Sequence, residues 1–167
     1  SILSSLGAAP RSIELEITET GLMKDLQGVV PSLHKLNQMG TEISIDDFGT
    51  GYSSLAYLTT LPISEVKIDR SFVRDLGDTP QSSAVVSAII ALARALGLRV
   101  IAEGVEKVSQ MEVLFNLGCH ICQGFLFARP MPPAQVEQWL ADTQSGLILP
   151  RVGNLPDGLE QGPHTAS

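Results

Sequence analysis

The chain has 167 residues, of which 44% are hydrophobic and 17% are charged, a balance that predicts a packed globular domain and excludes disorder throughout. Its formal net charge of −7 leaves no general basic surface for DNA or an anionic membrane. The longest uninterrupted apolar run, residues 88–93, is far shorter than the ~20 residues of a membrane-spanning helix. A phosphate ligand must therefore be bound by a few local cations or by metal ions.

The first predicted unit is a strand followed by a helix. The chain begins with Ser1 rather than Met, and residues 1–12 resemble the last turn of a helix, so we expect further chain upstream. Residues 13–17, Ile-Glu-Leu-Glu-Ile, then alternate strictly between apolar and charged, which predicts a strand. Apolar residues at helical spacing continue to Gly40, and Pro31 either begins or kinks that helix.

Four more strands alternate with helices along the rest of the chain. The predicted strands are residues 42–46, 65–68, 99–103 and 121–127. The predicted helices are a short one from Ser53 that stops before Pro62, residues 82–96, one with a capping box at residues 109–112 that ends at Gly118, and one opened by Pro132-Pro133 with Val136, Trp139 and Leu140 inward.

Strands that alternate with helices indicate an α/β fold with a parallel sheet. Two architectures are economical, an open doubly wound sheet and a TIM-type (β/α)8 barrel of which about the last five strand-helix units are present. We expect one domain over residues 1–142. Prolines and glycines interrupt every period beyond it, so residues 143–167 are predicted to be a flexible C-terminal extension.

The two cysteines, Cys119 and Cys122, form a C-x-x-C pair. Such a pair can be half of a zinc site, but no second pair of Cys or His with suitable spacing accompanies it. We therefore expect reduced thiols at the start of a strand.

Charged and amide side chains recur at the ends of successive predicted strands. They are Glu16, Asp46, Asp47, Lys67, Glu103 and Gln123. In a barrel, the carboxyl ends of all strands meet at one mouth, where such enzymes keep their active sites. Any one of these acids alone would be read as a solvated loop residue or a helix cap. Their recurrence over five strands favours one shared site.

Several carboxylates with one lysine, and no histidine, form an oxygen-rich site suited to Mg²⁺ or Mn²⁺ rather than zinc. On a regular strand Asp46 and Asp47 would point to opposite faces, but at a strand end the backbone can turn so that both reach a pair of ions. Two metals suit attack of water on a phosphodiester. Lys67 and Glu103 would orient or deprotonate that water.

Five motifs, in this order and spacing, resemble the bacterial EAL domain over roughly residues 1–142. They are Glu-Leu-Glu-Ile-Thr-Glu at 14–19, Asp-Asp-Phe-Gly-Thr-Gly-Tyr-Ser-Ser-Leu at 46–55, Val-Lys-Ile-Asp-Arg-Ser-Phe-Val at 66–73, Ile-Ala-Glu-Gly-Val-Glu at 101–106 and Cys-Gln-Gly-Phe-Leu-Phe at 122–127. The resemblance implies a TIM-barrel phosphodiesterase that opens cyclic di-GMP to linear pGpG with two Mg²⁺ or Mn²⁺ ions.

The resemblance also implies a role for each motif residue. The metal ligands would be Glu16, Asp46 and Asp47, and the attacking water would be handled by Lys67 and Glu103. Gln123 would lie beside the site. Glu19 would steady the loop that contains Gly49 and Gly51, and Glu106 would be a supporting acid farther out.

The chain departs from the family pattern at its front. It lacks the Glu-x-Leu segment with its following Arg and the later Asn before Leu-Ser, which implies about five of eight barrel strands. We therefore expect the fragment alone to be inactive and the parent protein to supply the rest, with sensory or cyclase domains upstream. The resemblance further implies a homodimer. From the acidic balance and the short apolar runs we expect neither DNA binding nor membrane contact by this segment, and we expect a cytoplasmic protein or the cytoplasmic domain of a membrane-anchored parent.

Two other readings remain. Asp47-Phe48-Gly49 matches a protein-kinase tripeptide, but no His-Arg-Asp or Val-Ala-Ile-Lys motif accompanies it, so the match is weak. A non-catalytic EAL-like module that binds a nucleotide or another protein is the serious alternative. The upstream reading frame separates the two, because it either supplies the missing Glu-x-Leu and Asn motifs or does not.

Overall fold

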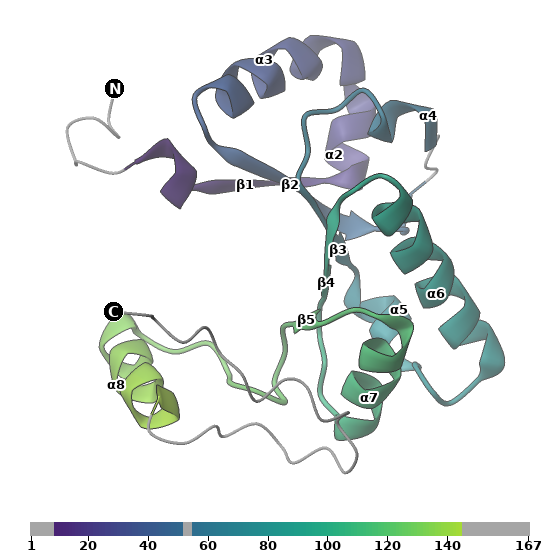
Figure 1. Cartoon of the computed structure of the whole chain (residues 1–167), viewed down its shortest axis with the longest axis vertical. Coiled ribbons are helices and arrows are strands. Elements are labelled where there is room, and N and C mark those ends of the chain that lie inside the picture. The colour runs from purple at the N-terminus through teal and green to yellow at the C-terminus, as the bar shows by residue number, and fades with distance from the viewer. Residues whose placement is uncertain (1–8, 52–54, 145–167) are drawn as a thin grey trace, which may run out of the picture. The chain divides into compact units, whose positions relative to one another are not determined.

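The structure, a computed structural model, describes residues 9–51 and 55–144. These residues form a parallel sheet in the chain order β1-β2-β3-β4-β5, with helices between the strands (Figure 1). The elements are the 3-10 helix η1 (Pro10–Ser12), β1 (Glu14–Thr18), α2 (Glu19–Lys24), α3 (Leu26–Gln38), β2 (Glu42–Phe48), α4 (Leu55–Leu58), β3 (Glu65–Ile68), α5 (Arg70–Arg74), α6 (Pro80–Ala95), β4 (Arg99–Ala102), α7 (Val108–Leu117), β5 (Ile121–Cys122) and α8 (Pro133–Gln144).

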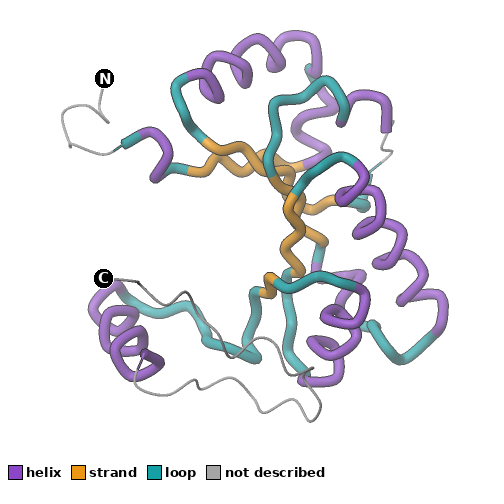
Figure 2. Tube along the Cα trace, in the orientation of Figure 1, coloured by secondary structure: helices purple, strands orange, loops and turns teal. Residues whose placement is uncertain are grey.

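The chain divides into two compact units, Ser1–Leu126 and Phe127–Ser167. In the first unit the helices lie along one side of the strands (Figure 2). The side chains of Ile43 and Ile45 on β2 and of Ile68 on β3 are buried. Together with the unbroken parallel order, this arrangement confirms the predicted α/β class and favours a segment of a barrel over a doubly wound sheet, which carries helices on both faces.

The sheet registers fix which residues of neighbouring strands lie side by side. Glu16 pairs with Ser44, and Thr18 pairs with Asp46. Lys67 pairs with Ile101 on β4. Because side chains alternate between the two faces of a strand, Glu16 and Lys67 lie on the face opposite to the buried isoleucines.

The predicted helix before Gly40 is two helices in the structure. Asp25 separates them, and its carboxylate accepts a hydrogen bond from the Gly28 N–H at 3.1 Å, which begins α3. Pro31 lies inside α3, so the reading that it begins the main helix is wrong. The side-chain cap at Asp25 starts α3 at Leu26, five residues before Pro31.

The helix α5 was not predicted. It follows Asp69, whose carboxylate caps it by accepting a hydrogen bond from the Ser71 N–H at 2.9 Å. With only five residues, α5 shows no full apolar period, which is why hydrophobic spacing could not reveal it.

The predicted capping box at residues 109–112 is wrong, because α7 begins earlier, at Val108. The N-cap of α7 is Lys107, and Gln110, three residues later, is the side chain that bonds back to the N-cap backbone. Its Oε1 accepts hydrogen bonds from the N–H groups of Lys107 and Glu106, both at 2.9 Å, and its Nε2 donates to the Arg74 carbonyl at 3.1 Å. Gln110 is buried, so a tertiary contact decides where this helix starts.

The last strand is shorter than predicted and ends at Cys122 rather than at residue 127. The Gln123 N–H still donates to the Ala102 carbonyl at 2.8 Å, but the Gln123 carbonyl accepts from the Val105 N–H at 3.0 Å. A side chain on Gly124 would clash with the Val105 carbonyl oxygen. Beyond Cys122 the chain therefore runs along the loop that follows Ala102, the last residue of β4, and no longer pairs as a strand.

In the second unit, the predicted inward direction of Val136 and Leu140 is wrong. These side chains are 37% and 46% exposed, and α8 is the only helix or strand in the described part of this unit. The predicted flexible extension falls almost wholly on residues 145–167, outside the described residues, and the boundary at residue 142 stays a prediction. Among the described residues, no helix combines the length and apolar character needed to cross a membrane.

Candidate active site

The candidate site is built around Lys67, whose side chain is only 7% exposed. Its Nζ lies 2.7 Å from Glu103 Oε1, 2.8 Å from Glu16 Oε1 and 3.7 Å from Asp46 Oδ1. These four side chains come from or directly follow β1, β2, β3 and β4. The predicted convergence is therefore present for four residues that are distant in the sequence.

Lys67 remains a cation in this surrounding. Burial on its own would lower the pKa of the Lys67 ammonium, but hydrogen bonds to Glu103 and Glu16 outweigh burial and raise the pKa above its usual value. Lys67 is therefore protonated at any physiological pH. It can orient and stabilise anions, but it cannot accept a proton from water.

Asp47 points to a different partner from Asp46. Its backbone has φ 54°, in the left-handed region that a residue other than glycine seldom adopts, and its N–H donates to Asp46 Oδ1 at 3.0 Å. The strand end thus turns as expected. The Asp47 carboxyl group is hydrogen bonded to that of Asp69.

The carboxyl groups of Asp47 and Asp69 differ in acidity. Burial, together with the charges of Asp46 and Asp69, raises the pKa of Asp47. Burial would also raise the pKa of Asp69, but hydrogen bonds from the Ser71 hydroxyl and N–H hold it below its usual value. Asp47 is therefore the weaker acid of the pair, and it takes up a proton before Asp69 as the pH falls.

The sequence prediction did not include Asp69, although a signal was present. Lys67-Ile68-Asp69 has a period of two, and this period places Asp69 on the face of Lys67 at the end of the same strand.

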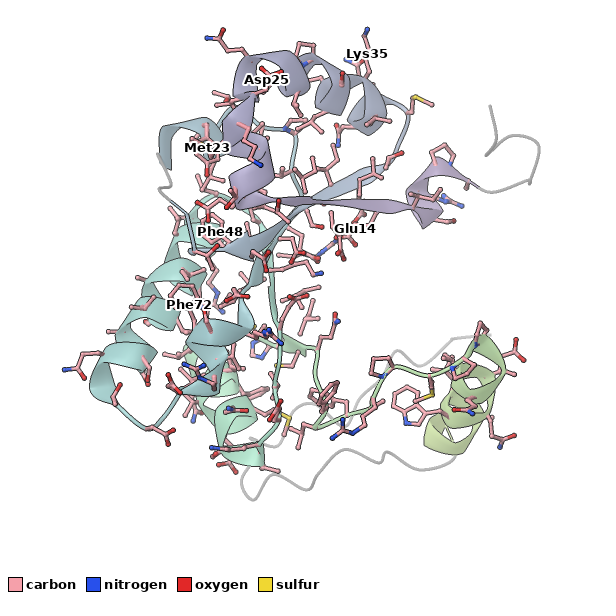
Figure 3. All side chains as sticks on the ribbon, turned by 180° about the vertical axis from the view of Figure 1, so that it is seen from behind. Glu14, Met23, Asp25, Lys35, Phe48 and Phe72 are labelled. Atoms are coloured by element: carbon pink, nitrogen blue, oxygen red, sulfur yellow. The ribbon has the colours of Figure 1, made fainter. Side chains whose placement is uncertain are left out.

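The glycine loop after β2 is anchored by Glu19, as the resemblance implied. Glu19 is fully buried, and its Oε2 accepts hydrogen bonds from the N–H groups of Gly49 at 2.9 Å and Gly51 at 3.2 Å. Gly49 has φ +96°, and a side chain there would lie 3.0 Å from Phe72, which Figure 3 labels on α5. Both the backbone conformation and the close approach require glycine at position 49.

Two predicted site residues lie outside this cluster. Gln123 is exposed, and its described contacts are the backbone bonds that hold it beside Ala102 and Val105. Glu106 is also exposed, and its N–H donates to Gln110. The roles predicted for these two side chains stay predictions.

A second charged cluster at the beginning of the strands was not predicted. Arg99 donates to Glu65 Oε2 at 3.0 Å and is paired with Glu42. Glu14, labelled in Figure 3, lies beside Glu65 and, after the effect of burial, helps to raise the pKa of that carboxyl group. Between the two clusters lies Ser44, whose buried hydroxyl has no hydrogen-bond partner among the residues that the structure describes.

The donor set of the candidate site fits a hard divalent ion, because carboxylate oxygens are the ligands that Mg²⁺ and Mn²⁺ prefer. In the described part of the chain, however, no three Asp, Glu, His or Cys side chains are placed to hold one ion together. Lys67 separates Glu16, Asp46 and Glu103, and Asp47 faces Asp69. Ligands beyond these residues would be needed to complete a metal site.

Comparison with known proteins gives the family. The family model described as "EAL domain" matches residues 1–130. The chain is 52% identical over 127 residues to the Pseudomonas aeruginosa protein named bifunctional diguanylate cyclase/cyclic di-GMP phosphodiesterase MucR, an alignment covering 76% of this chain and 18% of the relative.

Two solved structures extend the likeness to the fold. The PaMucR phosphodiesterase in complex with c-di-GMP matches with a TM-score of 0.77 and 50% identity, over 80% of this chain and 54% of that one. Klebsiella pneumoniae BlrP1 with manganese and cy-diGMP matches with a TM-score of 0.72 and 35% identity, over 77% of this chain and 33% of that one.

The chain thus spans about a fifth of the curated relative and about half of the solved phosphodiesterase chain. The match of family model, sequence and fold confirms the resemblance identified from five motifs, and with it the expectation of part of a TIM-type barrel. The chain belongs to the EAL domain family.

Proposed function

We propose that the protein containing this chain is a metal-dependent cyclic-di-GMP phosphodiesterase, which hydrolyses cyclic di-GMP to linear pGpG. The observation that carries this proposal is the convergence of Glu16, Asp46 and Glu103 on the Lys67 ammonium. The relatives named as cyclic-di-GMP phosphodiesterases, and the solved complexes that contain this nucleotide, support the choice of substrate.

The metal ligands from this chain would be Glu16, Asp46 and Asp47, and we propose two Mg²⁺ or Mn²⁺ ions. A related structure that contains manganese together with the nucleotide supports that choice. Bound divalent ions would neutralise the phosphate charge and lower the pKa of the attacking water. Because the pKa of Asp47 is raised, acid would protonate this ligand before Asp69 and weaken metal binding.

The residues of the chain have distinct tasks in this proposal. Lys67, which stays protonated, orients Glu103 through the 2.7 Å contact and stabilises negative charge on the phosphate. Glu103 is then the group that accepts the proton of the water, because Lys67 has no free lone pair for it. Glu19 holds the glycine loop in place through the N–H groups of Gly49 and Gly51.

Chromatography of the nucleotide products tests this function. We expect the full-length protein with Mg²⁺ or Mn²⁺ to convert cyclic di-GMP to pGpG, and we expect a Glu103→Gln variant, which keeps the size of the side chain, to leave the substrate intact. Residues 1–167 alone should show no turnover, because they span 54% of the solved phosphodiesterase chain. Intact substrate with the full-length protein and either metal would refute the proposal.

A second candidate is a non-catalytic module that binds cyclic di-GMP. It is favoured by the absence, among the described residues, of three side chains placed to hold a metal ion. Binding of the nucleotide by the full-length protein without any turnover in Mg²⁺ or Mn²⁺ would identify this case.

Three further expectations belong to the same proposal. We propose a homodimer, sensory or cyclase domains upstream, and a cytoplasmic location. The unpaired thiols of Cys119 and Cys122 support the last of these, because disulfides are rare in that compartment. The multidomain name of the MucR relative supports the second. Sedimentation of the full-length protein measures the oligomeric state directly.

A further inference from the structure

Gln110, on α7, is 3% exposed and connects two segments that adjoin the candidate site. Its Oε1 accepts hydrogen bonds from the N–H groups of Glu106 and Lys107, both at 2.9 Å. Its Nε2 donates to the Arg74 carbonyl at 3.1 Å. Glu106 and Lys107 lie in the loop that follows β4, and Arg74 is the last residue of α5, which follows β3 (Figure 1). One side chain therefore ties together the segments that follow two neighbouring strands.

The amide of Gln110 does more than cap α7. In a capping box the residue three positions after the N-cap is a glutamate or a glutamine, because either one accepts a hydrogen bond from the N-cap N–H. An ionised glutamate would have no donor for the Arg74 carbonyl. That carbonyl is in the last turn of α5, where carbonyls have no partner within the helix. The bond joins residues 36 positions apart, so it serves the packing of two segments rather than the start of a helix.

The beginning of the loop after β4 is also packed against α5. Gly104 has φ +69°, in the left-handed region that favours glycine, and a side chain there would clash with the Cβ of Arg70. Arg70 is the first residue of α5, and Arg74 is the last. The loop therefore contacts α5 at both ends, through Gly104 at the first residue and through Gln110 at the last.

These two segments carry the closest ion pair of the candidate site. Glu103 directly precedes Gly104, and its N–H donates to the Ile68 carbonyl at 3.1 Å. Its Oε1 lies 2.7 Å from Lys67 Nζ. Ile68 is the last residue of β3, and α5 begins two residues later. The bonds of Gln110 therefore hold the segment that carries Glu103 against the segment that follows Lys67.

We propose that Gln110 is a positioning residue for the hydrolysis of cyclic di-GMP, because it holds the loop in which Glu103 accepts the proton of the attacking water. This role depends on the proposed function. Without the amide, two N–H groups and one carbonyl lose their partners at a buried position and must turn toward other partners or water. The loop then shifts, and the Glu103 carboxylate loses its fixed place beside Lys67.

Steady-state kinetics of the full-length protein test this role. Gln110→Met keeps the length of the side chain and removes all three bonds. We expect kcat in Mg²⁺ or Mn²⁺ to fall roughly 10- to 100-fold, the loss that displacement of a catalytic group by about 1 Å produces. KM should change little, because no group of the candidate site is removed. An unchanged kcat, or a loss confined to KM, would overturn the proposal.

Gln110→Glu is the conservative variant. It keeps an acceptor for the N–H groups of Glu106 and Lys107 but removes the donor to the Arg74 carbonyl. We expect its kcat to lie between those of the wild-type protein and Gln110→Met. If Gln110→Met does not fold, Gln110→Glu decides alone, because its kcat should still lie below that of the wild-type protein. A wild-type kcat in Gln110→Glu would show that the bond to Arg74 plays no part in turnover, and the proposal would fail.

Leu114→Ala is the matched control for a loss of packing. Leu114 lies one turn after Gln110 on α7 and is fully buried, so this variant lowers the melting temperature without removing a bond to the loop. Well below that temperature, its kcat should equal the wild-type value. A fall in kcat as large as that of Gln110→Met would show that general loosening of α7 explains the loss, and would contradict a positioning role.

Amide hydrogen exchange of the metal-free protein gives a readout that does not depend on turnover. In Gln110→Met, peptides that cover residues 103–107 should exchange faster than in the wild-type protein, because the N–H groups of Glu106 and Lys107 have lost their acceptor. Unchanged exchange in this loop would overturn the role of Gln110. Faster exchange together with no turnover in the wild-type protein would refute the proposed function, and with it the catalytic purpose of Gln110, but would confirm that Gln110 orders the loop.

Discussion

Replacing Lys67 by methionine tests whether its ammonium holds the candidate site together. Methionine keeps the length and the apolar stem of the side chain but removes the charge. Glu16, Asp46 and Glu103 would then face one another without the cation that contacts them at 2.8, 3.7 and 2.7 Å. We expect the metal-free protein to be clearly less stable.

The structure sets the size of this effect. Removing one partner of a fully buried ion pair costs about 3–5 kcal/mol. The Glu16 side chain is 51% exposed, so water relieves part of that cost, and we expect about 2–3 kcal/mol. For a domain of this size, such a loss lowers the melting temperature by roughly 5–10 °C.

Thermal melts at several pH values provide the assay. The raised pKa of Lys67 means that its contribution in the wild-type protein is fully present at neutral pH and is lost only as the pH rises through that raised pKa. The deficit of the variant should be largest near neutrality and should shrink in acid, where the carboxylates lose their charge. Lys35→Met, at an exposed position on α3 that Figure 3 labels, is the matched control and should change stability by less than about 0.5 kcal/mol. Equal melting temperatures for the two variants would refute the reasoning.

Three further predictions concern Asp46 at the mouth, the glycine loop after β2, and the Arg99 cluster at the beginning of the strands. Asp46→Asn should reduce turnover at least ~10²-fold while the metal-free melting temperature stays equal or rises, since one of several crowded carboxylates loses its charge; a lower melting temperature with normal turnover would contradict this. Gly49→Ala should cost about 1–2 kcal/mol, measured by urea unfolding, because the residue has φ +96° and Phe72 is close; an unchanged midpoint would show that the loop adapts. Burial raises the pKa of Glu65, so wild-type stability should fall as pH rises from the ordinary carboxyl value through the raised one, and Glu65→Gln should flatten that fall; parallel pH profiles would exclude it.

The strands of the sheet and the composition of the site could be predicted because they depend on local alternation. The period of two in Glu14-Leu15-Glu16-Ile17 fixes both the strand and the face on which Glu16 lies. The convergence of Glu16, Asp46, Lys67 and Glu103 then follows from the parallel order of the strands alone.

The features that escaped prediction depend on contacts between distant segments. The start of α7 is set by the bond of Gln110 to the Arg74 carbonyl, and the end of β5 is set by the approach of Gly124 to Val105. The period of two already places Asp69 on the face of Lys67, but its contact with Asp47 depends on the left-handed backbone of Asp47 and on the folded chain. Such contacts exist only in the folded chain.

The inner face of the sheet explains why the mouth is suited to cations. Barrel interiors are usually filled by branched apolar side chains, but here two charged clusters occupy the two ends of the strands. At the floor, Arg99 is bound by two glutamates with Glu14 beside them. At the mouth, three carboxylates surround the one cation Lys67, with Asp47 and Asp69 close by.

In both clusters of described residues the acids outnumber the bases, but the two ends differ in how the excess is tolerated. Burial and the neighbouring Glu14 raise the pKa of Glu65, so that the floor can take up a proton, and the Arg99 pairs tie together the starts of β2, β3 and β4. At the mouth, Lys67 is the one cation in contact with Glu16, Asp46 and Glu103 among the described residues, and the pKa of the nearby Asp47 is raised. Negative charge therefore exceeds positive charge where the strands end, and a divalent cation bound there would offset the repulsion among these carboxylates.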